Sequence, residues 1–362
     1  MIKKEMISMS GSEEHVSRLM ELPRCVLISS DAVDETGVLC DRYHLSGKGI
    51  IVCDGMTRKI AGERVEKSLA DHGFEAEIVQ VEGATDASVE RVMDLDISDD
   101  ESFLLGCGGG RPIDVAKYVA TRCDRDFISV PTAASHDGIA SSRASIEMDG
   151  RKKSIMAKSP YIVIADTSII SRSPKRLLVS GCADIISNYT AVLDWKLAYR
   201  LKDVDFSEYA SALSEMTAKL IVERAHSIKP HLEESVRTVV KALVSSSVAM
   251  SIAGSSRPAS GSEHMFAHAL DQIAKKPPLH GDECGVGTIM MMYLHGGDWG
   301  RIKDALKTIG APVDAEELGV DEEEVVEALA EAHRIRPERY TILGDGLTNK
   351  AARKLAESTG VI

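Results

Sequence analysis

The chain has 362 residues, which predicts two domains at an ordinary size of about 150 residues each. Apolar residues make up 44% and charged residues 27%, and these proportions exclude a mainly disordered or collagen-like chain. The formal net charge of −13 argues against a protein that binds nucleic acid or an acidic membrane. A locally positive pocket for a small anion remains compatible with this negative net charge.

The seven cysteines are scattered and include no C-x-x-C pair, as is usual for reduced thiols in the cytoplasm. Residues 1–15 show no apolar core of a signal peptide, and no run of eighteen apolar residues predicts a membrane span. We therefore expect a cytoplasmic protein with no membrane insertion.

The first half of the chain alternates short apolar runs with helical stretches. The runs that resemble strands cover residues 48–54, 76–83, 102–110 and 126–132, and we expect 161–170 to be a last sheet or hairpin segment. Helical patterns lie between them, so the first half predicts a parallel sheet with helices on both faces.

From about residue 172 the apolar residues recur every three or four positions, and almost nothing is strand-like. The acidic run 321–324 is expected at a helix start, where negative charge favours the helix dipole. The predicted fold class is an α/β domain over residues 1–171, followed by an all-helical domain over 172–362.

A glycine-rich turn at 106–110 (GCGGG) joins a predicted strand to a helix with Pro112 in its first turn. Backbone without side chains can approach a pyrophosphate, and the N–H groups at the helix start point at the anion. Arg111 breaks the G-x-G-x-x-G spacing, so a plain tight turn remains an alternative. Asp54, which ends the strand 48–54, is either a ligand of the adenosine ribose or only a strand-end carboxylate.

Histidines mark a second candidate site. His264 and His268 are four residues apart and project from one helix face, and His280 follows a Pro-Pro break. Asp184 lies in an otherwise apolar helical stretch, where a buried carboxylate needs a partner. One Asp with two His leaves a metal position open for water or substrate, whereas hydrogen-bonded core histidines are the alternative. Asp137 falls on the loop after the strand 126–132, where ligand contacts concentrate or where it only caps a turn.

Several sequence blocks resemble one superfamily. Residues 108–117 (GGGRPIDVAK) resemble the cofactor loop of the superfamily that contains iron-dependent alcohol dehydrogenases, glycerol dehydrogenases and dehydroquinate synthases. The blocks 129–146, 260–271, 279–296 and 336–343 are similar to those of the sn-glycerol-1-phosphate dehydrogenase family. The resemblance runs from about residue 20 to the end of the chain.

The resemblance implies a dehydroquinate synthase-like fold, with a nucleotide in the first domain and a catalytic metal on the second, facing it across a cleft. It implies NAD(P)H and Zn²⁺ as cofactors and reversible hydride transfer to dihydroxyacetone phosphate. The product, sn-glycerol 1-phosphate, is the backbone of archaeal-type membrane lipids. The substrate would be a small phosphorylated triose, with no nucleic acid as partner, and we expect a homo-oligomer.

The resemblance also assigns residues. It puts the pyrophosphate on Gly108, Gly109, Gly110, Arg111 and Pro112, and the nicotinamide beside Thr132, Ala133, Ala134, Ser135 and Ser141. Asp54 would meet the ribose, the metal ligands would be Asp184, His264 and His280, and Asp137, Asp184 and His268 would face the substrate. The proton would come through His268 or a bound water. The loop reads T-A-A-S where T-S-L-S is the family's form, which removes a hydroxyl at Ala133 and bulk at Ala134.

Three alternatives remain within the superfamily. A glycerol dehydrogenase would share the Asp/His/His set. A dehydroquinate synthase-like lyase would have Glu as its first metal ligand and a lysine-bearing loop, whereas this chain has Asp184 and no such loop. An iron-type alcohol dehydrogenase would have His where Asn188 stands.

Two questions of specificity stay open at this stage. Asp54 would repel a 2′-phosphate, which favours NADH, while the neighbouring Thr57, Arg58 and Lys59 could accept one, so we expect use of both NADH and NADPH. For the substrate's phosphate, Arg143 is a candidate with Lys152, Lys153 and Lys158 assisting, and solvated surface cations are the alternative.

Overall fold

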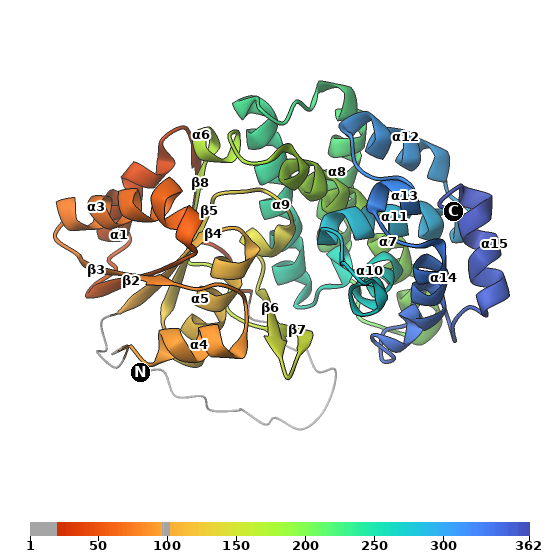
Figure 1. Cartoon of the computed structure of the whole chain (residues 1–362), viewed down its shortest axis with the longest axis horizontal. Coiled ribbons are helices and arrows are strands. Elements are labelled where there is room, and N and C mark those ends of the chain that lie inside the picture. Colours follow the sequence, from red (N-terminus) through yellow and green to blue (C-terminus); the bar gives the residue numbers. More distant parts are fainter. Residues whose placement is uncertain (1–19, 96, 98–101) are drawn as a thin grey trace, which may run out of the picture.

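The computed structural model describes residues 20–95, 97 and 102–362, and the prediction about a signal peptide in residues 1–15 lies outside them. An α/β part and a helical part lie side by side (Figure 1). The order of elements follows the expected change of texture, from strands alternating with helices to helices alone.

Six parallel strands form the main sheet. Their order is β1 (Cys25–Ser29), β8 (Ile162–Asp166), β5 (Asp126–Pro131), β4 (Phe103–Gly108), β2 (Lys48–Cys53) and β3 (Glu75–Gln80). In register, Gly49 of β2 lies opposite Phe103 of β4, and Val52 lies opposite Gly106. The central strands are buried on both faces, which is why their sequences are continuously apolar.

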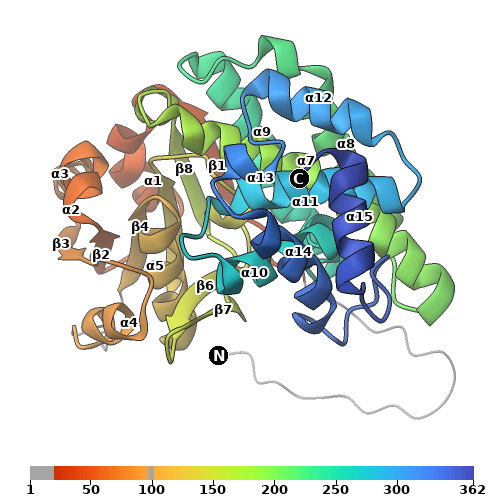
Figure 2. The same cartoon turned by 45° about the vertical axis from the view of Figure 1, so that its right-hand side comes forward.

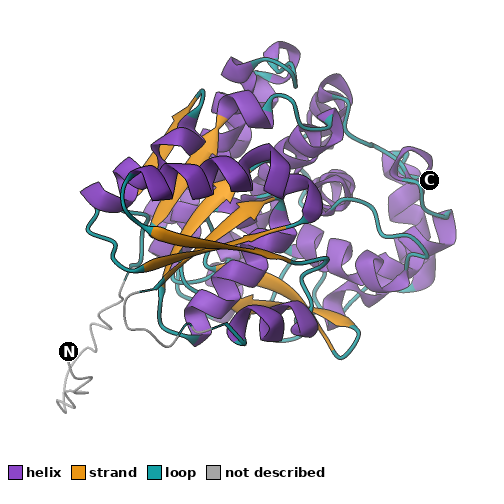
Figure 3. Cartoon of the chain, turned by 60° about the vertical axis from the view of Figure 1, so that its left-hand side comes forward, coloured by secondary structure: helices purple, strands orange, loops and turns teal. Residues whose placement is uncertain are grey.

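Helices cover both faces of this sheet, as predicted (Figure 3). On one face, Ile51 and Leu105 pack with α1 (Thr36–Arg42) and α3 (Glu63–Asp71). On the other, Ile50 and Leu104 belong to the core shared with α4 (Asp86–Met93), α5 (Gly110–Arg122) and the helical part. Between β2 and α3 the chain forms the short helix α2 (Gly55–Thr57) and a π-helical turn (Arg58–Gly62).

The structure differs from the sequence prediction in three places. Strand β1 was not predicted. An antiparallel hairpin of β6 (Arg143–Met148) and β7 (Arg151–Met156) was also missed, although Asp149-Gly150 at its turn, both with positive φ, is a usual hairpin signal. The predicted strand 161–170 is wrong in its second half, which is helix α6 (Thr167–Ile170), because the Asp166 side chain accepts the N–H groups of Ser168 and Ile169 and starts a helix.

The helical part contains α7 (Lys175–Lys202), α8 (Glu208–Glu223), α9 (Glu233–Ala253), α10 (Ser262–Ile273), α11 (His280–Leu294), α12 (Trp299–Ile309), α13 (Ala315–Leu318), α14 (Glu322–Glu331) and α15 (Asn349–Thr359). The acidic run 321–324 does begin a helix, since Asp321 and Glu324 form a capping box at the start of α14.

Helix α9 is long and apolar enough to cross a membrane, with a mean hydropathy of 1.4. Of its apolar window, 61% is buried inside the protein, where Val236, Val240 and Leu243 belong to the main core. This burial is what a core helix shows. No other helix in the described part of the chain meets the same criteria.

Candidate active site

The glycine turn lies where the strand order of the sheet reverses. From β2 the chain goes to its neighbour β3 at the edge, whereas from β4, on the other side of β2, it continues toward β5. Ligands of open parallel sheets bind at the carboxyl ends of the strands that flank such a point. Asp54 and Gly109 follow these two strand ends.

The glycines of the turn are there for different physical reasons. A Cβ on Gly108 would lie 2.8 Å from Cγ of Pro112, and one on Gly110 would lie 2.5 Å from Nε2 of His136. A Cβ on Gly109 would meet no atom within 4 Å, so the chain leaves open space there. Gly109 is the N-cap of α5 and provides no side-chain hydrogen bond, so the first N–H groups of the helix are available to an anion.

Asp54 has a clear structural role at the end of β2. Its Oδ1 accepts hydrogen bonds from the N–H groups of Met56 at 2.9 Å and Thr57 at 2.8 Å, and so it caps α2. The Thr57 hydroxyl in turn accepts from the Asp54 N–H at 2.9 Å. The carboxylate therefore stands beside the glycine turn in a fixed orientation.

The loop after β5 connects the glycine turn to the helical part. Its first residue, Thr132, donates its N–H to the Gly108 carbonyl at 2.9 Å. Ala133, Ala134 and Ser141 are buried, and the Ser135 carbonyl accepts from the Ser180 hydroxyl of α7 at 3.1 Å. The residues expected beside the nicotinamide thus all lie on one fixed loop between the two parts.

A fully buried lysine, which was not predicted from the sequence, supports this loop. Lys117 of α5 donates to the carbonyls of Gly138 and Arg143, both at 2.7 Å, and lies 3.4 Å from Asp114. Asp114 also accepts from the N–H of Ser145. The available signal was an acid and a base three residues apart inside a buried helix.

Asp184, His264 and His280 converge in the helical part. Their candidate ligand atoms, with the Sγ of Cys284, all lie within 4.8 Å of one another. Nε2 of His264 is 3.7 Å from Oδ1 of Asp184, and the His264 and His280 ring centres are 5.0 Å apart. Cys284 was not predicted here, although it lies one helical turn after His280, 3.7 Å from its Nε2.

The loop after β5 reaches this cluster through Asp137. Its N–H donates to Oδ2 of Asp184 at 2.8 Å, and its carboxylate accepts from the Ser246 hydroxyl at 3.1 Å. Burial, then the charge of Asp137, raises the pKa of Asp184 to about 7. A buried carboxylate beside a second negative charge is costly without a cation nearby.

The imidazoles are held in different electrostatic environments. Burial lowers the pKa of His264, but the hydrogen bond and charge of Glu263, with Asp184, outweigh burial and leave it raised. Burial lowers the pKa of His268 to about 3, helped by the nearby charge of Arg336. Burial and the charge of His264 also lower the pKa of His280 well below its usual value.

Glu263, which was not predicted from the sequence, orients His264. Its Oε1 is 3.0 Å from Nδ1 of His264 and accepts the Gly261 N–H at 2.6 Å, while its Oε2 accepts the Thr190 hydroxyl at 2.7 Å. A carboxylate on the far nitrogen of an imidazole fixes the tautomer that presents Nε2 to a metal. An acid next to a candidate ligand was the only available signal.

His268 lies beside the cluster. Its candidate ligand atom is within 4.8 Å of those of Asp271 and His280. Asp271 is ion-paired with Lys152 of the hairpin at 2.6 Å, so β7 lies against α10 near the histidines (Figure 2).

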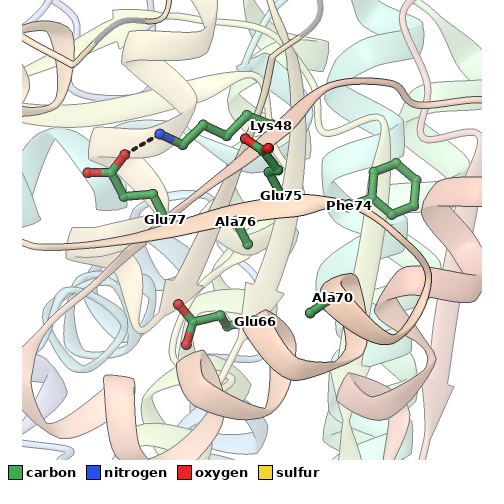
Figure 4. A pocket seen from close by; sticks show the side chains of 7 residues that line it. All are labelled: Lys48, Glu66, Ala70, Phe74, Glu75, Ala76 and Glu77. Carbon is green, nitrogen blue, oxygen red and sulfur yellow. Dashed lines mark hydrogen bonds and ion pairs between the residues drawn. The ribbon is translucent and has the colours of Figure 1, made fainter.

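A separate hollow lies at the opposite end of the sheet. It is lined by Lys48, Glu66, Ala70, Phe74, Glu75, Ala76 and Glu77, and Lys48 points toward Glu77 within it (Figure 4). Lys48 and Glu75 begin their strands, so the hollow lies at the amino ends. It is therefore remote from the glycine turn.

The fold and the site define a class. Residues 27–174 match the family model described as iron-containing alcohol dehydrogenase. The structure is similar to that of glycerol dehydrogenase from Schizosaccharomyces pombe, with a TM-score of 0.80 over 96% of this chain and 91% of that chain, at 20% identity. A probable glycerol dehydrogenase from Sinorhizobium meliloti gives 0.75 over 95% and 98%, at 19% identity. These likenesses confirm the predicted fold class.

More similar sequences specify the family. The chain is 58% identical to the glycerol-1-phosphate dehydrogenase [NAD(P)+] of Methanothrix thermoacetophila, over 95% of this chain and 97% of that one. The enzyme of the same name from Methanothermobacter thermautotrophicus is also 58% identical, over 95% and 99%. The chain belongs to the NAD(P)-dependent glycerol-1-phosphate dehydrogenase family, as its sequence blocks indicated.

Proposed function

We propose that this protein reduces dihydroxyacetone phosphate to sn-glycerol 1-phosphate with NAD(P)H and a catalytic zinc ion. The observation that carries the proposal is the meeting of Asp184, His264 and His280 beside Asp137, whose loop also borders the glycine turn. The name shared by the similar proteins supports the reaction.

The donor set fits a zinc ion. One carboxylate and two imidazoles are ordinary zinc ligands, and three protein ligands leave a position open for substrate. Burial and the charge of Asp137 raise the pKa of Asp184, and a divalent cation would offset the repulsion between the two carboxylates. We propose Asp184, His264 and His280 as the ligands and give Cys284 no such role.

We propose that the nucleotide binds at the carboxyl ends of β2 and β4, where the strand order of the sheet reverses. The pyrophosphate would lie over Gly108, Gly109 and Gly110 at the start of α5, with Arg111 and Pro112 beside it. The nicotinamide would lie along the loop from Thr132 through Ala133, Ala134 and Ser135 to Ser141. Asp54 would accept the ribose hydroxyls through Oδ2, because both capping hydrogen bonds, from the N–H groups of Met56 and Thr57, go to Oδ1.

A zinc ion held by Asp184, His264 and His280 would supply Lewis-acid polarisation of the substrate ketone, and a bound nicotinamide would supply the hydride. Glu263 holds the His264 ring, and the Asp137 N–H holds the Asp184 carboxylate, so both ligands are oriented before substrate arrives. His268 and Asp137 would face the substrate. A neutral His268 ring both donates and accepts hydrogen bonds, which suits it to pass a proton directly or through a water molecule.

We place the product in the synthesis of archaeal-type membrane lipids and the enzyme in the cytoplasm. All seven cysteines are unpaired, which suits a reducing compartment. We propose that the chain forms two domains, 1–171 and 172–362. We also propose that several copies of the chain assemble into a homo-oligomer.

The experiment is removal and return of the metal. Dialysis against dipicolinate should abolish NAD(P)H oxidation with dihydroxyacetone phosphate, and stoichiometric Zn²⁺ should restore it. Elemental analysis should find about one zinc ion per chain in the active enzyme. Full activity in protein with no detectable metal would overturn the zinc proposal.

A further inference from the structure

Two arginines from distant parts of the chain lie near each other and near His268. Arg143 begins β6 in the α/β part, and Arg336 follows the 3₁₀ turn Ala332–Arg334 in the helical part. The hairpin that Arg143 begins contacts α10, the helix of His268, through the ion pair of Lys152 with Asp271 at 2.6 Å. Arg336 donates to the hydroxyl of Ser260, two residues before the same helix. In agreement with this placement, the charge of Arg143 is, after burial, the main cause that lowers the pKa of Arg336, and both charges act on His268. Both side chains are partly buried.

Neither guanidinium is neutralised by the protein. Among the described residues, no carboxylate lies within ion-pair distance of Arg143 or Arg336. Arg143 donates from Nε and Nη2 to Ser154, at 3.2 and 2.7 Å. Arg336 donates from Nη1 to the hydroxyls of Ser256 at 3.3 Å and Ser260 at 3.4 Å. Each guanidinium has five N–H groups, so each keeps donors for a ligand.

A third arginine adds to the positive charge. Arg339 donates to the Ser260 carbonyl at 2.6 Å and to the Ser256 hydroxyl at 3.0 Å, so it shares both serines with Arg336. Burial and the charge of Arg336 lower the pKa of Arg339 to about 9. Like charges gathered in a partly buried place are costly unless an anion joins them.

The acids nearby are exposed or already occupied. Glu338 is exposed to solvent. The buried Glu263, whose charge also reaches Arg336, accepts hydrogen bonds from the Gly261 N–H and the Thr190 hydroxyl, and it contacts Nδ1 of His264 at 3.0 Å. These acids do not neutralise the arginines.

The lysines expected to assist are also occupied. Lys152 pairs with Asp271 at 2.6 Å, Lys153 with Asp149 at 3.3 Å, and Lys158 with Asp124. Their charges are therefore committed to carboxylates, whereas those of Arg143 and Arg336 are not.

We propose that Arg143 and Arg336 form an anion subsite that binds the phosphate group of the substrate. Guanidinium groups fit phosphate oxygens with two parallel hydrogen bonds each, and a dianion would neutralise both charges. Because Arg143 and Arg336 belong to different parts of the chain, the phosphate joins the hairpin to the helical part beside His268. The identity of the phosphate as that of a triose rests on the proposed function.

The test compares Arg143→Gln and Arg336→Gln with Arg334→Gln. Arg334 is a matched control, because it lies two residues from Arg336, is exposed and is paired with Glu331 at 2.7 Å. Two readouts are measured: the ratio of kcat/KM for dihydroxyacetone phosphate to that for dihydroxyacetone, and direct binding of inorganic phosphate by calorimetry. Circular dichroism and Arg336→Lys, which keeps the positive charge, check for structural damage.

Each glutamine variant should lower the substrate ratio roughly 10- to 100-fold, the scale of lost charge-assisted hydrogen bonds, and weaken phosphate binding by a similar factor. Arg334→Gln should change neither, and Arg336→Lys should lose less than Arg336→Gln. If Arg336→Gln does not fold, Arg143→Gln on the hairpin carries the test. Equal losses on both substrates, or unchanged phosphate binding, would overturn the subsite.

The two readouts separate this inference from the proposed function. If the wild-type protein reduced no dihydroxyacetone phosphate, the proposed function would fail, but phosphate binding that depends on Arg143 and Arg336 would still support the anion subsite. If the wild-type enzyme preferred the phosphorylated substrate and the variants kept that preference, only the subsite would fail.

Discussion

The backbone N–H of Asp137 donates a hydrogen bond to Oδ2 of Asp184 at 2.8 Å. With the bond from the Ser180 hydroxyl to the Ser135 carbonyl, this contact joins the loop that follows β5 to α7, the helix that carries the first candidate metal ligand. A shift of this loop would therefore disturb the metal cluster as well as the nucleotide side. The two halves of the proposed reaction are coupled through the main chain.

Replacing a candidate ligand should remove the metal. His280→Ala should lower bound zinc well below one per chain and reduce kcat at least 100-fold, because a ligand is lost from a three-ligand site. Zinc content by elemental analysis and NADH oxidation measure the two effects. His226→Ala, at an exposed position, is the control and should change neither. Full zinc occupancy and activity in His280→Ala would exclude His280 as a ligand.

Filling the open space at Gly109 should block the nucleotide. Gly109 has a φ of −77° and an added Cβ meets no protein atom within 4 Å, so Gly109→Val should fold normally. Its branched side chain would occupy the space proposed for the pyrophosphate and raise KM for NADH at least tenfold. Circular dichroism checks the fold, and Gly109→Ala should give a smaller effect. An unchanged KM for both nucleotides would mean that the turn is only structural.

Removing the charge that orients His264 should weaken zinc binding. Glu263→Gln keeps the size of the side chain but replaces a carboxylate that contacts Nδ1 of His264 at 3.0 Å. Loss of such an outer partner typically costs 10- to 100-fold in metal affinity. Competition with a zinc chelator measures this affinity, and Glu331→Gln, at a half-exposed position, serves as control. Wild-type affinity in Glu263→Gln would contradict the orienting role.

A buried acid should make stability depend on pH. Both carboxyl oxygens of Glu283 are buried without a hydrogen-bond partner among the described residues, and burial raises its pKa well above the usual value. A raised folded-state pKa gives stability that is present below the unfolded value, near 4.3, and is lost as pH rises toward the folded value. Glu283→Gln should therefore raise Tm, and by more at pH 8 than at pH 5. An equal or smaller gain at pH 8 would show that the carboxylate is stabilised in its charged form.

The strands and helices that depend on residues close together in the sequence were largely predicted. The central strands of the sheet appeared as apolar runs because they are buried on both faces, and α7, which carries Asp184, was apparent from its helical spacing. The spacing of the histidines alone did not decide between a metal site and hydrogen-bonded core histidines. The resemblance to known families named the candidate ligands.

Contacts between distant residues were less visible. Glu263 has only its position next to a candidate ligand as a local signal, and Arg336 has no local pattern that marks an anion site, because their contacts come from what the fold places beside them. Arg336 approaches Arg143 only when the hairpin lies against the helical part, and Lys117 gains its role only when the loop after β5 folds over α5. Side chains that are paired in space but far apart in sequence require the structure.

The most direct measurement of the central claim is the reaction itself, with both candidate substrates and a stereochemical readout. NADH and NADPH oxidation are followed with dihydroxyacetone phosphate and with dihydroxyacetone, and the phosphorylated product is assayed with an enzyme specific for sn-glycerol 3-phosphate. We predict a strong preference for the phosphorylated substrate, zinc dependence, and a product that this enzyme does not oxidise. Equal or faster turnover of dihydroxyacetone, or formation of sn-glycerol 3-phosphate, would contradict the account.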